Sequence, residues 1–113
     1  GPSAVTAAVS LAGIAGNQFQ FLGFIPQKKG RETFFKGLAT ASVPTVFFES
    51  THRILKALES IGKVMPDTKI YVARELTKMH EELLVGTAME ILEIINNEPV
   101  KQKGEFVIIV EAS

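Results

Sequence analysis

The order of hydrophobic and polar residues along the chain predicts several short strands. Aromatic residues alternate with others in 19–25 (FQFLGFI), which is typical of a strand, and Pro26 closes the segment. The uninterrupted apolar run in 105–112 indicates a strand buried on both faces. The predicted strands are residues 19–25, 44–49, 69–74, 81–86 and 105–112, of which 81–86 has the weakest pattern.

Helical periodicity separates these strands. The clearest helix runs from His52 to Met65, where apolar residues recur on one face and Ser50 or Thr51 can cap the first turn. Thr87 begins a capping box that predicts another helix, ending near residues 96–97. The predicted helices are residues 4–12, 33–41, 52–65 and 87–97.

Strands and helices therefore alternate. This order predicts an α/β domain with a mixed central sheet of about five strands flanked by helices. Most of the phenylalanines are expected in the core, because the predicted strands and helices bury an apolar face. These residues are Phe21, Phe24, Phe34, Phe35, Phe47 and Phe48.

Composition narrows the class of protein. A chain of 113 residues has room for one domain, and 46% hydrophobic with 21% charged residues is typical of a folded chain. Twelve basic residues balance twelve acidic ones, so any attraction to nucleic acid must come from a local patch. Cysteine is absent, which excludes disulfides and thiolate chemistry. With no apolar run long enough to cross a bilayer, we expect a cytoplasmic protein without a membrane partner.

The common catalytic motifs are absent from the sequence. Its two histidines, His52 and His80, do not have the spacing of a metal pair, so we expect no metal site. Carboxylates near the predicted strand ends are suited to acid–base chemistry, but an ion pair of Glu75 and a solvated Glu81–Glu82 pair are the favoured explanation. The carboxylates are Glu49, Glu75, Glu81 and Glu82.

Basic residues gather in three predicted loops. If the strand ends bring these loops together, they form a positive rim suited to phosphate groups; otherwise each is a solvated surface. The clusters are Lys28, Lys29 and Arg31, then His52 and Arg53, and finally Arg74 and Lys78.

Longer segments carry a more specific signal. They are GPSAVTAAVSLAG (1–13), FLGFIPQKKGRE (21–32), VFFESTHRI (46–54), VARELTKMHEELLVGT (72–87) and KGEFVIIVE (103–111). In order and spacing they resemble the small-subunit ribosomal RNA 2′-O-methyltransferases of the tetrapyrrole methylase superfamily, over nearly the whole chain. One departure is Thr51, where that family usually has proline.

The resemblance implies a function and a set of site residues. It implies an S-adenosylmethionine-dependent enzyme that methylates a cytidine ribose in small-subunit ribosomal RNA, with residues 1–113 as its C-terminal domain. The cofactor would lie in a cleft shared with an N-terminal domain that this chain lacks, so the chain alone is expected to be inactive. The implied cofactor residues are Ser3, Ala4, Phe48, Ala73 and Glu105, and Glu75 is a weak candidate for the catalytic base.

Other inferences follow from the same resemblance, together with charge. The implied RNA contacts are Lys28, Lys29, Arg31, Arg53, Arg74 and Lys78. A homodimer is also implied, since this superfamily commonly forms one. Two alternatives stay open: a methyltransferase acting on a porphyrin-like substrate, and a non-catalytic dimerisation or binding module. The exact nucleotide stays open as well, as does the origin of residues 1–3, which also match a common expression scar.

Overall fold

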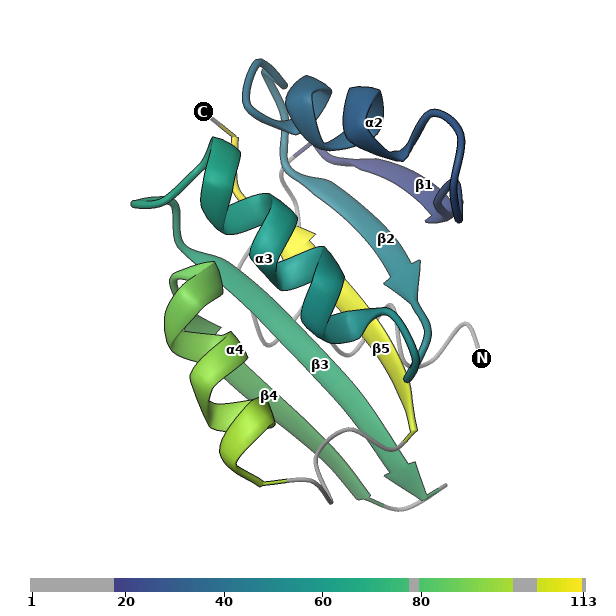
Figure 1. The fold of residues 1–113 in the computed structure, drawn as a ribbon, viewed down its shortest axis with the longest axis vertical. Helices are drawn as coiled ribbons and strands as arrows, with labels where there is room; N and C mark the ends of the chain where they lie inside the picture. The colour runs from purple at the N-terminus through teal and green to yellow at the C-terminus, as the bar shows by residue number, and fades with distance from the viewer. Residues whose placement is uncertain (1–17, 78–79, 99–103, 113) are drawn as a thin grey trace.

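A computed structural model describes residues 18–77, 80–98 and 104–112, without the side chains of 75–81. The predicted helix over 4–12 lies outside these residues. The elements, shown in Figure 1, are β1 (Gln20–Phe24), α2 (Arg31–Leu38), β2 (Thr45–Glu49), α3 (Ile54–Val64), β3 (Ile70–Thr77), β4 (His80–Gly86), α4 (Ala88–Asn97) and β5 (Glu105–Val110).

The five strands form one mixed sheet in the order β1-β2-β5-β3-β4. β1 runs parallel to β2, and β5 is antiparallel to both β2 and β3. β1, β2 and β3 therefore all end at the same edge of the sheet, where β5 begins. We call this the carboxyl edge. The predicted fold class, a mixed α/β sheet flanked by helices, is confirmed.

All three labelled helices lie on one face of the sheet (Figure 1). The apolar stripe predicted for 52–65 is buried there, with Ile54, Leu58 and Ile61 fully covered. Phe47 on β2 packs edge-on against Phe34 of α2 with ring centroids 5.2 Å apart. Burial of this stripe and of the aromatic rings is the main stabilising contribution on this face.

The second face of the sheet carries its own apolar cluster. Val46, Tyr71, Ala73, Val107 and Ile109 are buried together there, with Phe48 and Leu83 packed against them. On β5 the intervening residues Phe106, Ile108 and Val110 belong to the helix-side core. β5 is thus buried on both faces, as its unbroken apolar run predicts.

Two local expectations are wrong. Phe21 and Phe24 are 50% and 73% exposed, because β1 is an edge strand and both rings lie on the face opposite the labelled helices. Neither Ser50 nor Thr51 caps α3: the N-cap is Arg53, which makes no side-chain cap hydrogen bond, and the Thr51 hydroxyl donates to Gly104 O instead. Among the described residues no helix is long and apolar enough to cross a membrane.

The capping box of α4 gives a testable pH dependence. Thr87 N donates to Glu90 Oε1 and Glu90 N donates to Thr87 Oγ1, as the sequence predicts. The backbone hydrogen bond from Thr87, and then its side chain, lower the pKa of Glu90 below its ordinary value of 4.5. Because the folded-state pKa is the lower one, this stabilisation is present above the ordinary value and is lost as pH falls through the folded-state pKa.

We expect Thr87→Ala to destabilise the protein by about 1 kcal/mol at neutral pH, since the first turn of α4 loses its cap. Glu90→Gln should be destabilising at neutral pH and should match the unsubstituted chain once Glu90 is protonated. Urea unfolding at neutral pH and well below the ordinary pKa measures both effects. Glu93→Gln, on the same helix, removes an equal charge and should show no such pH dependence. If the free energy of unfolding changes with pH in the same way for Glu90→Gln and Glu93→Gln, the capping box does not stabilise α4.

Candidate functional site

A pocket lined by basic residues opens at the carboxyl edge, between the loop after β1 and the start of α3. Its volume is about 380 Å³. We call it the basic pocket and define it by its lining residues Gln27, Lys28, Arg31, His52, Arg53 and Lys56. It therefore unites two of the three basic clusters that the sequence contains.

The loop between β1 and α2 is shaped by residues with special backbone properties. Pro26 follows the end of β1 by two residues, and Gly30 adopts a left-handed φ of 86° immediately before α2. Glycine takes this conformation without the steric cost that a side chain would meet. Arg31 Nη1 donates to Pro26 O at 3.1 Å, so the first residue of α2 holds the start of the loop. Gln27 and Lys28 are thereby carried to the pocket.

Arg31 forms a largely buried ion pair beside the pocket. Its Nη2 lies 2.7 Å from Glu49 Oε2, and the two side chains are 14% and 5% exposed. Ser50 N donates to Glu49 Oε1, and the Arg31 guanidinium lies over the Phe35 ring at 5.1 Å. Charge-assisted hydrogen bonds of this kind fix the position of both side chains. Arg31 thus lines the pocket while joining α2 to the end of β2.

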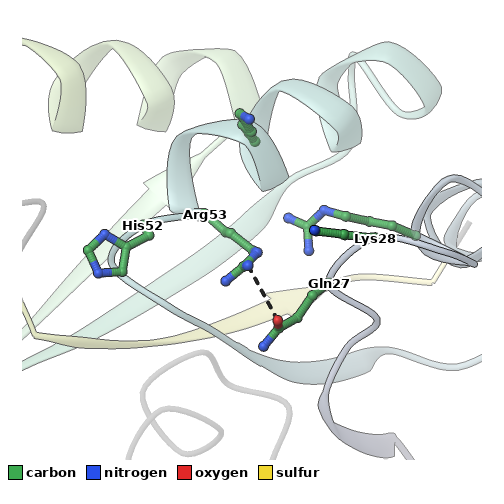
Figure 2. Close-up of a pocket in the computed structure, with 6 residues that line it drawn as sticks. Gln27, Lys28, His52 and Arg53 are labelled. Atoms are coloured by element: carbon green, nitrogen blue, oxygen red, sulfur yellow. Dashed lines mark hydrogen bonds between the residues drawn. The ribbon is translucent and has the colours of Figure 1, made fainter.

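The other wall of the pocket comes from α3 and the residues before it. Arg53 Nη2 donates to Gln27 Oε1 at 3.3 Å, which links the two walls (Figure 2). His52 precedes Arg53, and Lys56 follows it by one helical turn, so the three residues share one end of the helix. The first amides of a helix add a partial positive charge there. The arrangement is suited to anionic groups such as phosphates.

A second hollow of about 470 Å³ lies between α2 and α3 and shares Lys28 and Arg31 with the basic pocket. Two further cations line it, Lys36 and Lys63. Each is within 4 Å of a glutamate one helical turn away on its own helix, at 3.2 and 3.6 Å respectively. Glu32 also lines the hollow, so the charges of these lysines are largely balanced by the neighbouring carboxylates. The unbalanced positive charge therefore lies at the basic pocket, with Lys28 and Arg31 shared between the two hollows.

Three of the residues implied for the cofactor, Phe48, Ala73 and Glu105, are among the described residues, and they lie on the second face of the sheet. Phe48 on β2 and Ala73 on β3 both pair with Val107 of β5, so they lie on either side of it. Phe48 is half-buried, Ala73 is 8% exposed, and Glu105 is exposed at the start of β5. Ser3 and Ala4 lie outside the described residues. The backbone of Glu75 pairs with that of Glu105, at the same edge.

The remaining implied RNA residues differ in their surroundings. Lys29 is exposed in the loop that also carries Lys28. Arg74 is 3% exposed and lies 3.7 Å from Glu82, so its side chain is oriented within the sheet rather than toward a surface ligand. Lys78 lies outside the described residues. Gln27 and Lys56 were not among the implied residues, although Lys56 lies at helical spacing from His52 and Arg53, a signal the sequence does contain.

Comparison with known proteins identifies the family. Residues 1–92 match the family described as Tetrapyrrole (Corrin/Porphyrin) Methylases. The chain belongs to the tetrapyrrole methylase family. Within it, the chain is 38% identical over 110 residues to the ribosomal RNA small subunit methyltransferase I of Thermotoga maritima, covering 97% of this chain and 49% of that protein.

Other relatives carry the same name. The protein of Neisseria meningitidis serogroup B is 39% identical over 111 residues, covering 97% of the chain and 38% of the relative. That of Escherichia coli O157:H7 is 38% identical over 113 residues, covering 98% and 40%. The chain therefore spans less than half the length of these relatives. Their names support a methyltransferase.

Solved structures of tetrapyrrole methylases share the fold. The cobalt precorrin-4 methyltransferase CbiF aligns with a TM-score of 0.62 at 14% identity, over 95% of this chain and 48% of CbiF. The methyltransferase CobJ aligns with a TM-score of 0.63 at 19% identity, over 97% and 48%. At these identities the likeness establishes the architecture alone.

Proposed function

We propose that this chain is the C-terminal half of an S-adenosylmethionine-dependent enzyme that methylates a cytidine 2′-hydroxyl in small-subunit ribosomal RNA. The observation that carries the RNA part is the basic pocket, which gathers cations from two loops at the carboxyl edge of the sheet. Relatives named as ribosomal RNA methyltransferases support the same substrate class. Ligands of open α/β sheets commonly bind at this edge.

The described residues suit S-adenosylmethionine. Ala73 is buried beside Val107, and half-buried Phe48 carries the rings of Phe21 and Phe24, so these residues would offer the cofactor only a narrow apolar strip. The exposed carboxylate of Glu105 can accept hydrogen bonds from a hydroxyl or an ammonium group. When bound, the cofactor supplies an electrophilic methyl group. An N-terminal domain in the same protein would complete the cleft, and two such proteins would form a cytoplasmic homodimer.

The basic pocket would hold the RNA backbone. Lys28, His52, Arg53 and Lys56 offer hydrogen-bond donors to phosphate oxygens, and Lys29 lies in the same loop. Arg31 keeps its ion pair with Glu49, so its part is to hold the loop in place. Arg74 is left out of this interface because its side chain is buried. Phosphate contacts of this kind fix the position of the RNA and add affinity without reading its sequence.

Methyl transfer to a ribose also needs the 2′-hydroxyl aligned with the methyl group of the cofactor, and a group that accepts the hydroxyl proton. Glu75 remains the candidate for the base, since its backbone pairs with that of Glu105 at the carboxyl edge. The protein would then bind the RNA backbone on the helix side of this edge and the cofactor on the other side, beside β3 and β5. The target ribose would lie between them.

RNA binding tests the substrate class. We expect Lys28→Ala and Arg53→Ala together to weaken binding of single-stranded RNA by about tenfold, because two phosphate contacts are lost. The slope of log affinity against log salt concentration should fall by about 1.4, at about 0.7 for each contact with a single strand. Fluorescence anisotropy across a salt series measures both quantities.

Lys69→Ala is the matched control, since it removes one charge from an exposed residue at the opposite edge of the sheet. It should change neither the affinity nor the slope beyond the general effect of net charge. If Lys69→Ala weakens binding as much as Lys28→Ala alone does, the binding is non-specific attraction and the basic pocket is not the RNA site.

A further inference from the structure

β1 exposes aromatic side chains to solvent. Phe24 is 73% exposed and Phe21 is 50% exposed, and Phe19 and Leu22 on the same segment are 40% and 44% exposed. Soluble proteins rarely leave apolar side chains gathered in this way without a binding partner. Three of the four are aromatic rings, which suits the face of a planar group better than an aliphatic surface would.

A β-bulge places two of these rings on one side of the sheet. Phe21 pairs with Val46, but the register then shifts, so that Gly23 pairs with Phe47 and Phe24 with Phe48. Leu22 is the extra residue, and Gly23 has a left-handed φ of 65°. In a regular strand Phe21 and Phe24 would point to opposite faces, because three positions separate them. Bulges at sheet edges redirect side chains in this manner.

The result is a cluster of three rings on the second face of the sheet. The Phe48 ring lies 5.2 Å from that of Phe21 and 5.1 Å from that of Phe24. Phe48 is half-buried and supports the other two from below. Phe24 thus has a large exposed surface and a fixed neighbour. We call Phe21, Phe24 and Phe48 the aromatic platform.

The platform and the basic pocket lie on opposite faces of the sheet, and both reach its carboxyl edge. Phe24 ends β1, and Gln27 and Lys28 follow within four residues, a span of at most about 14 Å even when fully extended. On β2, Phe48 of the platform points to the second face, whereas the next residue, Glu49, is ion-paired to Arg31 of the pocket on the helix side. A strand of RNA that passes around the carboxyl edge would reach both. Exposed aromatic rings next to a groove of cations are the combination that binds single-stranded nucleic acid, through stacking and phosphate contacts together.

We propose that the aromatic platform stacks an unpaired base of the RNA substrate, with Phe24 as the main stacking surface. This inference rests on the proposed RNA function and extends it to a base subsite beside the phosphate site. The positive charge of the neighbouring pocket favours RNA over a second copy of the chain, whose net charge is zero. Stacking is tolerant of base identity, so the subsite would anchor the strand rather than select its sequence.

Binding of a single-stranded RNA of about ten nucleotides, with one 2-aminopurine near its centre, tests the platform. We expect Phe24→Ala and Phe24→Leu each to weaken binding by about tenfold, because leucine is apolar but cannot stack, while Phe24→Tyr keeps the affinity. Quenching of 2-aminopurine on binding should be lost with Ala and Leu only. Val85→Ala, at the exposed edge strand β4, is the control and should match the unsubstituted chain.

The outcomes separate this inference from the function on which it rests. If Phe24→Ala and Phe24→Leu bind RNA normally while Lys28→Ala does not, the platform is wrong and the RNA function stands. If neither the unsubstituted chain nor a longer protein that contains it binds RNA, both are wrong. Sedimentation velocity under the same conditions detects the competing explanation. A dimer that Phe24→Ala dissociates, with RNA affinity unchanged, would make the platform a protein–protein contact and overturn the inference.

Discussion

Arg31→Ala is expected to lower the free energy of unfolding by about 3 kcal/mol, the lower end of the range for breaking a buried ion pair. The substitution leaves Glu49, which is 5% exposed, without the guanidinium that lies 2.7 Å from it. A buried carboxylate without its partner carries a large desolvation cost. The lower end of the range applies because Arg31 retains some contact with water, at 14% exposure.

Urea unfolding of three variants measures this cost. Lys36→Ala breaks an exposed pair with Glu32 on the same helix and should cost no more than about 0.5 kcal/mol. The double replacement Arg31→Met with Glu49→Leu should recover most of the lost stability, because no charge is then left buried. If Arg31→Ala costs as little as Lys36→Ala, the pair does not hold α2 to the end of β2.

Arg31→Ala should also change RNA binding at the basic pocket. Arg31 also donates to Pro26 O and so fixes the loop that carries Gln27 and Lys28. RNA affinity should therefore fall in Arg31→Ala even though Arg31 is not proposed to touch phosphate. The double replacement with Glu49→Leu should regain stability without regaining RNA affinity. That difference distinguishes a positioning residue from one that matters only for stability.

Much of the fold is predictable from the sequence because local and tertiary preferences agree. The stripe along α3 and the unbroken apolar run of β5 both describe surfaces that end up fully buried. Thr87 and Glu90 form their capping box from a four-residue pattern, which needs no distant contact. Where the residues that interact are close together in the sequence, the sequence predicts the local structure well.

Features that depend on distant residues were missed. Nothing near Phe24 in the sequence indicates that its strand lies at an edge of the sheet, so the ring was expected in the core. Arg31 pairs with Glu49 eighteen positions away, whereas the resemblance together with charge implies a phosphate contact for it. The bulge at Gly23 arises from pairing with β2, which no local pattern reveals. Gln27 joins the site only because α3 begins beside it.

The largest expected difference in activity is between the chain alone and a longer protein that also contains the proposed N-terminal domain. The chain covers 49% of the Thermotoga maritima relative and 38% of that from Neisseria meningitidis. The proposed cofactor residues would form only one side of the cofactor cleft, and one side alone would neither bind the cofactor tightly nor align its methyl group with the ribose hydroxyl. We therefore expect no transfer by the chain alone and ready transfer by the longer protein.

The most direct test is transfer of a radiolabelled methyl group from S-adenosylmethionine to small ribosomal subunits, followed by nucleoside analysis of the RNA. The longer protein should produce labelled 2′-O-methylcytidine, the chain alone should produce none, and Lys28→Ala with Arg53→Ala should slow the longer protein without weakening its cofactor binding. Label found instead on a porphyrin-like substrate, or transfer by the longer protein that is insensitive to the basic pocket, would contradict the proposed function.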